Sequence, residues 1–256
     1  MRQLLLVRHG ESRWNAEGRI QGQACAGLSE RGRAQAQALV DTIGPGLQQQ
    51  LSADPAAVRL VTSDLQRAAE TAAPLAHALG LEPVHDQRLR ERSFGSWEGR
   101  SHAELATDDP ERYRRWTTGV DVMGEIGAET ATALADRVAP ALAELLTATP
   151  RGGVTVAVSH GGSIWHGLHR LLRLPPRSLG PVGNAAVAQL LLLLEEDAAP
   201  GRVDEGTTGG NGSGRLLPGG AHPVLASYND LAHLPAGLRT GGFATSTTAD
   251  AVPQMR

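Results

Sequence analysis

The sequence predicts a three-layer α/β/α sandwich with a mostly parallel central sheet. Three short apolar runs, residues 4–7, 60–62 and 154–158, have the composition of buried parallel strands. Segments with apolar residues at helical spacing alternate with these runs, and such alternation is typical of helices that cover both faces of a sheet. A chain of 256 residues is long enough to bury one core of this kind.

The first two predicted helices have clear start or stop signals. Ser29 can cap a helix that runs to Ile43, because its hydroxyl can accept a hydrogen bond from the first turn. Between residues 65 and 79, Leu and Ala recur at helical spacing and form an apolar stripe. Gly80 follows where a C-terminal cap belongs.

Two further helices flank the third predicted strand. Before it, Leu and Val form an apolar stripe over residues 134–146, but Pro140 lies within the stripe and favours a kink or a late helix start. Directly after it, residues 161–172 are expected to be helical. These helices complete the alternating pattern.

The C-terminal part of the chain predicts two more strands and two segments without regular structure. An apolar run over 186–194 can join the same sheet, and residues 224–228 can form an edge strand. Between them, residues 198–220 are rich in Gly, Thr and Pro, which is typical of a mobile insert. We expect one domain over residues 1–234 and a disordered tail over 235–256.

Composition excludes several classes of protein. The net charge is −3, so no excess of positive charge is available for a nucleic-acid backbone. All 24 positive side chains are Arg, which rules out chemistry that needs a lysine. The single cysteine, Cys25, excludes an internal disulfide and fits a reducing cytoplasm. The longest apolar run, residues 190–194, is too short for a membrane span. We expect a soluble cytoplasmic protein.

Unusual polar residues follow the three predicted parallel strands. Arg8 and His9 follow the first strand, Arg67 lies shortly after the second, and His160 follows the third. In an open parallel sheet, ligands bind outside the carboxyl ends of the strands. The sequence therefore predicts that two histidines and two arginines meet at one rim, where they can bind and attack phosphate.

These residue types suit phosphoryl transfer. A neutral imidazole is a good nucleophile toward phosphorus. Arg8 and Arg67 offer planar guanidinium forks for phosphoryl oxygens, with His160 as a third donor. Gly161 leaves room for close backbone approach. Glu91 is the best candidate for the acid that protonates the leaving alkoxide and then activates water.

The ordered motifs resemble the histidine phosphatase superfamily, in the branch that contains the cofactor-dependent phosphoglycerate mutases. The similarity begins with LVRHGESRWN at residues 6–15 and covers roughly residues 3–195. The other matching motifs are GRIQG at 18–22, LSERG at 28–32, SDLQRA at 63–68, Glu91 with Gly95, and SHG at 159–161.

The resemblance implies a phosphoglycerate mutase-like fold and assigns roles to individual residues. His9 would be the phosphorylated histidine and Glu91 the proton donor. The resemblance also implies that Arg8, Arg67 and His160 form the phosphate pocket. Further contacts to the phosphoryl group are implied for Asn15, Gln21, Gly22, Gly161 and Asn184.

Each of these residues also has a structural interpretation. His9 could be a hydrogen-bonded rim histidine and Arg67 an exposed helix residue. Glu91 could pair with a neighbouring arginine, Arg90 or Arg92. Asn15 and Gln21 could serve as turn or capping residues, as could Asn184. A metal site using the histidines at 160, 166 and 169 is not expected, because no carboxylate lies at ligand spacing beside them. We expect no metal and no other cofactor.

Three functions remain in competition. The segment FGSWEG at residues 94–99 resembles the phosphatase members of the family, whereas Arg114 and Arg115 resemble an arginine pair of the mutases. A binder without catalytic activity should lack one of the central residues, and all are present. We therefore expect a phosphomonoesterase acting on a small phosphorylated metabolite, a sugar phosphate or a phosphoglycerate derivative. A lid over residues 100–130 would shape its pocket, and a homodimer is plausible by resemblance.

Overall fold

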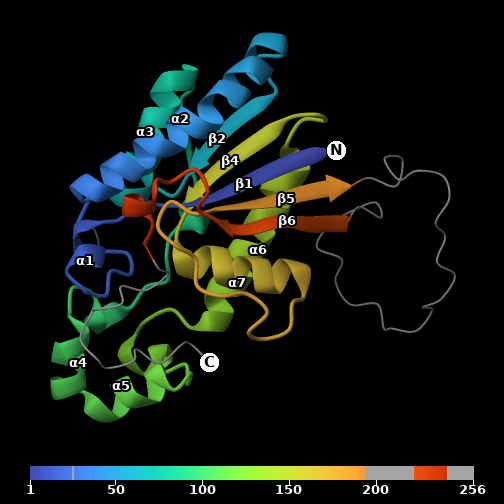
Figure 1. Ribbon diagram of the computed structural model, residues 1–256. Coiled ribbons are helices and arrows are strands. Elements are labelled where there is room, and N and C mark those ends of the chain that lie inside the picture. The colour runs from blue at the N-terminus through green and yellow to red at the C-terminus, as the bar shows by residue number, and fades with distance from the viewer. Residues whose placement is uncertain (25, 194–221, 241–256) are drawn as a thin grey trace, which may run out of the picture.

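A computed structural model describes residues 1–24, 26–193 and 222–240 (Figure 1). Its strands are β1 (Arg2–Arg8), β2 (Val58–Thr62), β3 (Val84–His85), β4 (Val154–Ser159), β5 (Val187–Leu193) and β6 (His222–Asp230). They form one sheet in the order β3-β2-β4-β1-β5-β6. The strands β3, β2, β4 and β1 are parallel, whereas β5 is antiparallel to both of its neighbours. The prediction of a mostly parallel sheet is confirmed.

Helices cover both faces of this sheet. The helices of the described residues are α1 (Arg13–Ala16), α2 (Glu30–Ala53), α3 (Gln66–Leu79), α4 (His102–Asp108), α5 (Pro110–Thr117), α6 (Ala131–Ala148) and α7 (Gly161–Leu172). The pair α2 and α3 lies on one face and the pair α6 and α7 on the other (Figure 1). The predicted three-layer sandwich is therefore confirmed.

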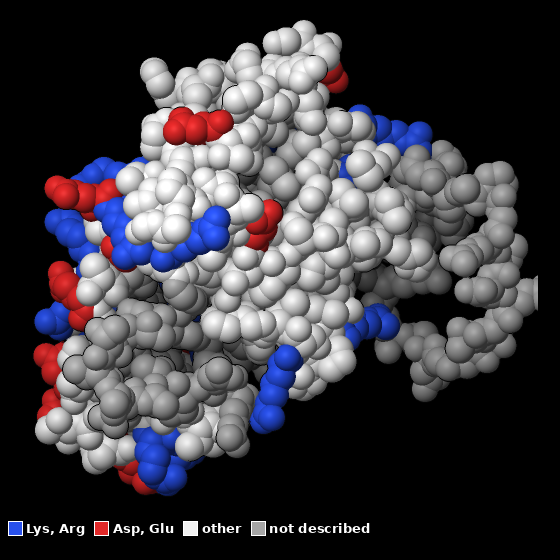
Figure 2. Space-filling model, viewed as in Figure 1, with Lys and Arg blue, Asp and Glu red and all other residues white. Residues whose placement is uncertain are grey.

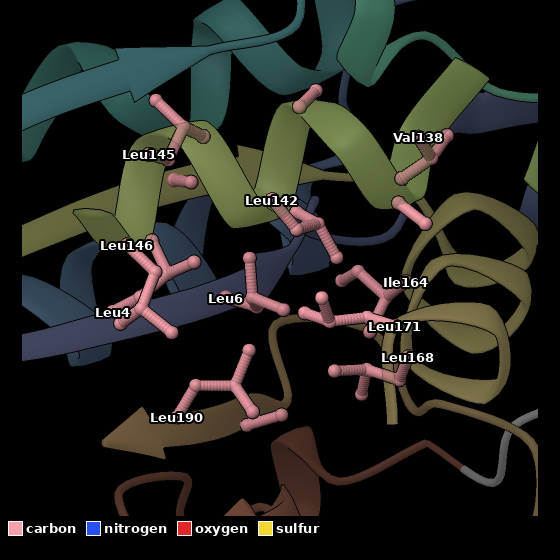
Figure 3. Packing of buried hydrophobic residues seen from close by; sticks show 14 of the residues in the cluster. Leu4, Leu6, Val138, Leu142, Leu145, Leu146, Ile164, Leu168, Leu171 and Leu190 are labelled. Atoms are coloured by element: carbon pink, nitrogen blue, oxygen red, sulfur yellow. The ribbon is translucent and has the colours of Figure 1, made fainter. Parts of the chain in front are cut away.

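Alternating side chains of β1 divide between two cores. Leu4 and Leu6 pack toward α6 and α7, as Figure 3 shows, whereas Val7 belongs to the cluster beneath α2 and α3. Gly167 allows α6 and α7 to approach closely, because a Cβ atom at this position would lie 2.6 Å from Cγ1 of Val138. Burial of these apolar side chains supplies most of the driving force for folding.

Two helices differ from the sequence prediction. α2 continues beyond Ile43 to Ala53, because Leu47 is buried in the core and packing outweighs the weak helix propensity of the Gly-Pro-Gly segment before it. α6 runs through Pro140 and starts at Ala131, where the side chain of Thr130 caps it. The expected late start is therefore wrong. The ends that were predicted for α3 and α7 are confirmed.

Residues 235–240 differ from the expected disordered tail. They include a short 3₁₀ helix (Ala236–Leu238), and Gln35 Nε2 donates a 2.7 Å hydrogen bond to the carbonyl oxygen of Leu238. Contacts with a distant helix thus order a segment whose own composition favours disorder. The predicted insert at 198–220, the rest of the tail and Cys25 lie outside the described residues. Within the described part of the chain, no helix has the length and apolar character needed to span a bilayer.

The predicted lid segment forms a small helical unit beside the main sheet. It contains α4, α5 and a 3₁₀ helix (Met123–Ile126), and it has its own apolar cluster around Trp97, Leu105 and Met123. Trp116 makes an edge contact with Trp97, with ring centroids 5.6 Å apart. This apolar cluster is separate from the two main cores.

Candidate active site

Adjacent strands place the two predicted histidines side by side. β1 and β4 are paired in register at Arg8 and Ser159, and the residue after each is a histidine. The backbone N–H of His9 donates to the carbonyl oxygen of Ser159 at 2.9 Å, and the His9 and His160 ring centroids lie 5.1 Å apart. Both rings are buried. The strand-end geometry expected from the sequence is present.

Hydrogen bonding defines the tautomer of His9. Its Nδ1 lies 2.6 Å from the carbonyl oxygen of Gly10, which can only accept, so Nδ1 carries the proton. Nε2 therefore keeps its lone pair, and Arg67 Nε donates to it at 3.2 Å. Burial, together with the charges of Arg67 and Arg8, holds the pKa of His9 well below its usual value. The ring is thus neutral and nucleophilic near pH 7.

Gly10 brings this nucleophile against α2. A Cβ atom at this position would lie 2.5 Å from the carbonyl oxygen of Gly32, so a side chain has no room. The Gly10 N–H donates to Thr71 Oγ1 at 3.0 Å. The close approach explains why glycine follows His9.

Two arginines surround the His9 ring with positive charge. Arg67, on the first turn of α3, is 1% exposed and donates to the carbonyl oxygens of Gly22 and Ala24 at 2.7 and 3.0 Å. Burial lowers the pKa of Arg8 to about 10, an effect that Glu91 opposes and Arg67 reinforces. The Arg8 guanidinium group therefore remains charged at neutral pH. A phosphate dianion between Arg8 and Arg67 would relieve the repulsion between the two arginines.

His160 presents a second imidazole to this site. Its Nε2 lies 2.9 Å from Ser63 Oγ, and its buried Nδ1 has no hydrogen-bond partner among the described residues. Burial and the nearby charge of Arg67 lower the pKa of His160 well below its usual value. The Nδ1 nitrogen is therefore available to bind a ligand or a water molecule at the site.

Backbone N–H groups hold the carboxylate of Glu91. Oε2 accepts from the N–H of Gly162 at 3.0 Å and Oε1 accepts from the N–H of Arg92 at 2.8 Å. The neighbouring arginines pair elsewhere, Arg90 with Asp64 and Arg92 with Asp121. The alternative that Glu91 is their ion-pair partner is therefore wrong.

Three amide side chains meet near the N-terminus of α1. Asn184 Nδ2 lies 3.2 Å from Asn15 Oδ1 and 3.4 Å from the carbonyl oxygen of His9. Gln21 Oε1 accepts from Ser12 Oγ at 2.6 Å. Asn15 also forms a capping box with Ser12, so the capping interpretation holds for it alongside its place next to Asn184.

The glycines predicted to bind phosphate occupy crowded positions. Gly22 has φ of +55°, and a Cβ atom there would collide with the carboxylate of Glu98. A Cβ atom on Gly161 would lie 3.4 Å from Arg8 Nε, which places this residue beside the guanidinium group. A larger residue at Gly22 would therefore disturb Glu98 and the loop around it, whereas a methyl group at Gly161 would make only an ordinary contact with Arg8.

Several residues of the site were missed at the sequence level. Glu98 accepts hydrogen bonds from the N–H groups of Gln23 and Ala24 at 3.0 Å and so shapes the loop that binds Arg67. Glu98 belongs to the segment 94–99, which resembles the phosphatase members of the family, but that resemblance does not predict its hydrogen bonds to Gln23 and Ala24. Thr240 Oγ1 donates to Asn184 Oδ1 at 3.2 Å, a contact that no local pattern encodes.

Other candidates lie apart from this cluster. The ring of His169 packs on Trp165, with centroids 3.8 Å apart. Across residues 1–24, 26–193 and 222–240, no group of three His, Cys, Asp or Glu side chains could hold a metal ion. Arg114 and Arg115 pair with Glu111 and Glu125 on the lid. Figure 2 shows positive and negative side chains interspersed on the side that carries the lid.

Comparison with known proteins decides the family. Residues 4–197 match the model of the histidine phosphatase superfamily (branch 1). The chain belongs to this superfamily. The family, the fold and the phosphatase class that the sequence predicts are confirmed.

Curated members of the superfamily resemble the chain over most of its length. It is 36% identical over 199 residues to a glucosyl-3-phosphoglycerate phosphatase of Mycobacterium tuberculosis, covering 74% of this chain and 85% of that protein. It is also 37% identical over 179 residues to a Citrobacter koseri protein named "Probable phosphoglycerate mutase GpmB", covering 68% and 77%.

Solved structures agree with this assignment. A structure named "Mycobacterial hydrolase 1" has a TM-score of 0.69 at 33% identity and covers 90% of this chain and 99% of its own. A mycobacterial glucosyl-3-phosphoglycerate phosphatase in complex with VO3 has a TM-score of 0.64 at 36% identity, covering 75% and 94%.

Proposed function

We propose that this enzyme hydrolyses phosphomonoesters of small metabolites through a phosphohistidine on His9. The observation that carries the proposal is the state of the His9 ring. Its Nδ1 is bound to the carbonyl oxygen of Gly10, and its Nε2 faces Arg67 inside a buried cluster of positive charge. A neutral nucleophile held beside two guanidinium groups suits attack on a phosphoryl dianion.

In the first step, His9 Nε2 attacks phosphorus and the bond to the leaving oxygen breaks. Arg8 and Arg67 stabilise the charge on the phosphoryl oxygens, and His160 Nδ1 supplies a further contact. Glu91 donates its proton to the departing oxygen, which leaves as an alcohol. The products of this step are phosphohistidine and an ionised Glu91.

In the second step, the carboxylate of Glu91 takes a proton from water, and the resulting oxygen attacks phosphorus. The bond between phosphorus and Nε2 breaks, inorganic phosphate leaves, and His9 regains its lone pair. Asn15, Gln21 and Asn184 are proposed to orient the phosphoryl group, with Gly22 and Gly161 giving it close access to the backbone. The hydrogen bond between Asn184 and Asn15 supports this grouping.

Hydrolysis is favoured over mutase-type transfer by the lid. A mutase must hold a substrate carboxylate, and the arginine pair that could do so is engaged elsewhere, because Arg114 and Arg115 pair with Glu111 and Glu125. Matching proteins carry both phosphatase and mutase names, so transfer is the alternative. The name of the mycobacterial phosphatases supports a glycosylated phosphoglycerate or another sugar phosphate as substrate.

A phosphate-release panel over phosphosugars, phosphoglycerates and nucleotides tests this function. We expect net phosphate release from one of the first two groups, with little interconversion of 3- and 2-phosphoglycerate in the presence of 2,3-bisphosphoglycerate. Efficient interconversion without phosphate release would overturn the proposal in favour of a mutase. We also propose that the enzyme acts in the cytoplasm, since a single cysteine leaves no internal disulfide. We further propose that it needs no metal ion, because two arginines and two histidines supply the electrostatic stabilisation.

A further inference from the structure

Arg92 links the proton donor to the lid. Its backbone N–H donates to Glu91 Oε1 at 2.8 Å, so the orientation of this peptide sets the direction of the carboxylate. The Arg92 residue is 8% exposed. Its guanidinium group pairs with Asp121 and donates through Nε to the carbonyl oxygen of Glu129 at 2.6 Å. The buried side chain of Arg92 thus holds in place the backbone N–H that binds the carboxylate of Glu91.

Asp121 joins three parts of the fold. Besides its ion pair with Arg92, its carboxylate accepts from the N–H of Ala131, the first residue of α6, at 2.6 Å. It also accepts from the N–H of Met123 at 3.3 Å. One carboxylate therefore connects the end of the lid, the start of α6 and the residue next to Glu91.

The chain before Glu91 is fixed without help from the lid. The carbonyl oxygen of Arg90 accepts from Ser163 Oγ at 2.7 Å and from Arg137 Nη1 at 3.1 Å, and the Arg90 side chain pairs with Asp64. Gly162 holds the second carboxylate oxygen of Glu91. Arg92 therefore connects the lid to the other oxygen, through its ion pair with Asp121 and its hydrogen bond to the carbonyl oxygen of Glu129.

We propose that Arg92 and Asp121 are positioning residues that aim Glu91 at the leaving oxygen and so couple the lid to proton donation. The proposal rests on the proposed function, in which Glu91 is the proton donor. Misplacement of a catalytic group by about 1 Å can cost about 10²-fold in rate. Weakening the pair should therefore slow only those reactions in which the leaving group needs a proton.

Two aryl phosphates of similar size separate this role from a role in binding. Phenyl phosphate has a basic leaving group that needs protonation, whereas 4-nitrophenyl phosphate has a leaving group that departs without it. In the full-length enzyme, we expect Arg92→Gln and Asp121→Asn to lower kcat for phenyl phosphate by about 10-fold to 100-fold and kcat for 4-nitrophenyl phosphate by less than about 3-fold. Arg92→Lys should recover part of the loss, since lysine keeps the charge that pairs with Asp121.

A control within the same lid sharpens the test. Asp108→Asn removes the exposed ion pair with Arg100, which has no contact with Glu91. It should leave the ratio of the two rates unchanged. Retained 4-nitrophenyl phosphatase activity shows that the variants fold.

Two results would overturn the positioning role. One is equal slowing of both substrates by Arg92→Gln, which indicates loss of folding or of phosphate binding. The other is no change with either substrate. If the parent enzyme releases phosphate neither from the two aryl esters nor from the metabolite panel, the proposed function itself fails. That result can be told apart from the two results above, because they concern the variants only.

Discussion

Nδ1 of His9 lies 2.6 Å from the carbonyl oxygen of Gly10. This contact places the proton on Nδ1 and leaves a lone pair on Nε2. In the proposed mechanism, this lone pair attacks phosphorus. The same glycine cannot carry a side chain, because its Cα lies against the backbone of Gly32. The order His9-Gly10 therefore has a physical reason at both positions.

Replacing His9 tests the covalent intermediate. His9→Ala should lower kcat by about 10³-fold or more, because no other group in the cluster is placed to take the phosphoryl group. Labelled substrate quenched during turnover should leave acid-labile phosphate on this ring in the parent enzyme. A fully folded variant with normal turnover would refute the mechanism.

Replacing Glu91 tests the proton donor. Glu91→Gln keeps the size of the side chain and one of the two backbone hydrogen bonds, because its amide nitrogen cannot accept, and it removes the transferable proton. We expect a loss of about 10² to 10⁴ in rate for alkyl phosphates and a much smaller loss for activated aryl phosphates. Steady-state rates on both classes provide the measurement. Equal slowing of both would count against the role.

The buried imidazoles predict a pH-dependent stability. Burial, reinforced by Arg67, lowers the pKa of both His9 and His160. Below the unfolded-state pKa of about 6.5, the unfolded chain binds protons that the folded chain does not, so stability falls as the pH drops. The free energy of unfolding, measured in denaturant, should decrease as the pH is lowered from 7 to 5. His9→Gln should make that slope shallower by up to about 1.4 kcal/mol per pH unit, and an unchanged slope would contradict the assignment.

Metal removal is expected to have no effect. Arg8, Arg67 and the two imidazoles offer the positive charge and hydrogen-bond donors that phosphoryl transfer needs. After dialysis against EDTA, kcat/KM should match that of untreated enzyme. Loss of activity that added Zn²⁺ or Mg²⁺ restores would show that the prediction is wrong.

Two helix glycines should respond in opposite directions to alanine. Gly167→Ala inserts a methyl group 2.6 Å from Val138 Cγ1 and should destabilise the protein by about 1–3 kcal/mol. Gly46→Ala in α2 meets nothing within 4 Å and should stabilise it by about 0.5–1 kcal/mol. Thermal and denaturant melts of both variants provide the measurement. A stabilising Gly167→Ala would show that α6 and α7 can move apart at little cost.

The catalytic cluster could be predicted because its parts follow local patterns. Apolar runs identify buried strands, and the carboxyl ends of parallel strands meet at one rim. These two facts predict that Arg8, His9 and His160 lie together, as the pairing of β1 with β4 shows. The exposed two-residue β3 gave no such signal. The direction of β5 was also beyond prediction, because an apolar run carries no information about strand polarity.

The sequence by itself determined the fold class, the family and the identity of the arginines and histidines that cluster around His9, since periodicity and motif order are properties of neighbouring residues. Tertiary structure alone decided which partners hold that cluster in place. Arg92 finds Asp121 29 residues away, and Thr240 reaches Asn184 from 56 residues away. Local patterns show which side chains are buried. They do not show which groups face one another in the folded chain, and hydrogen bonds depend on this spatial arrangement.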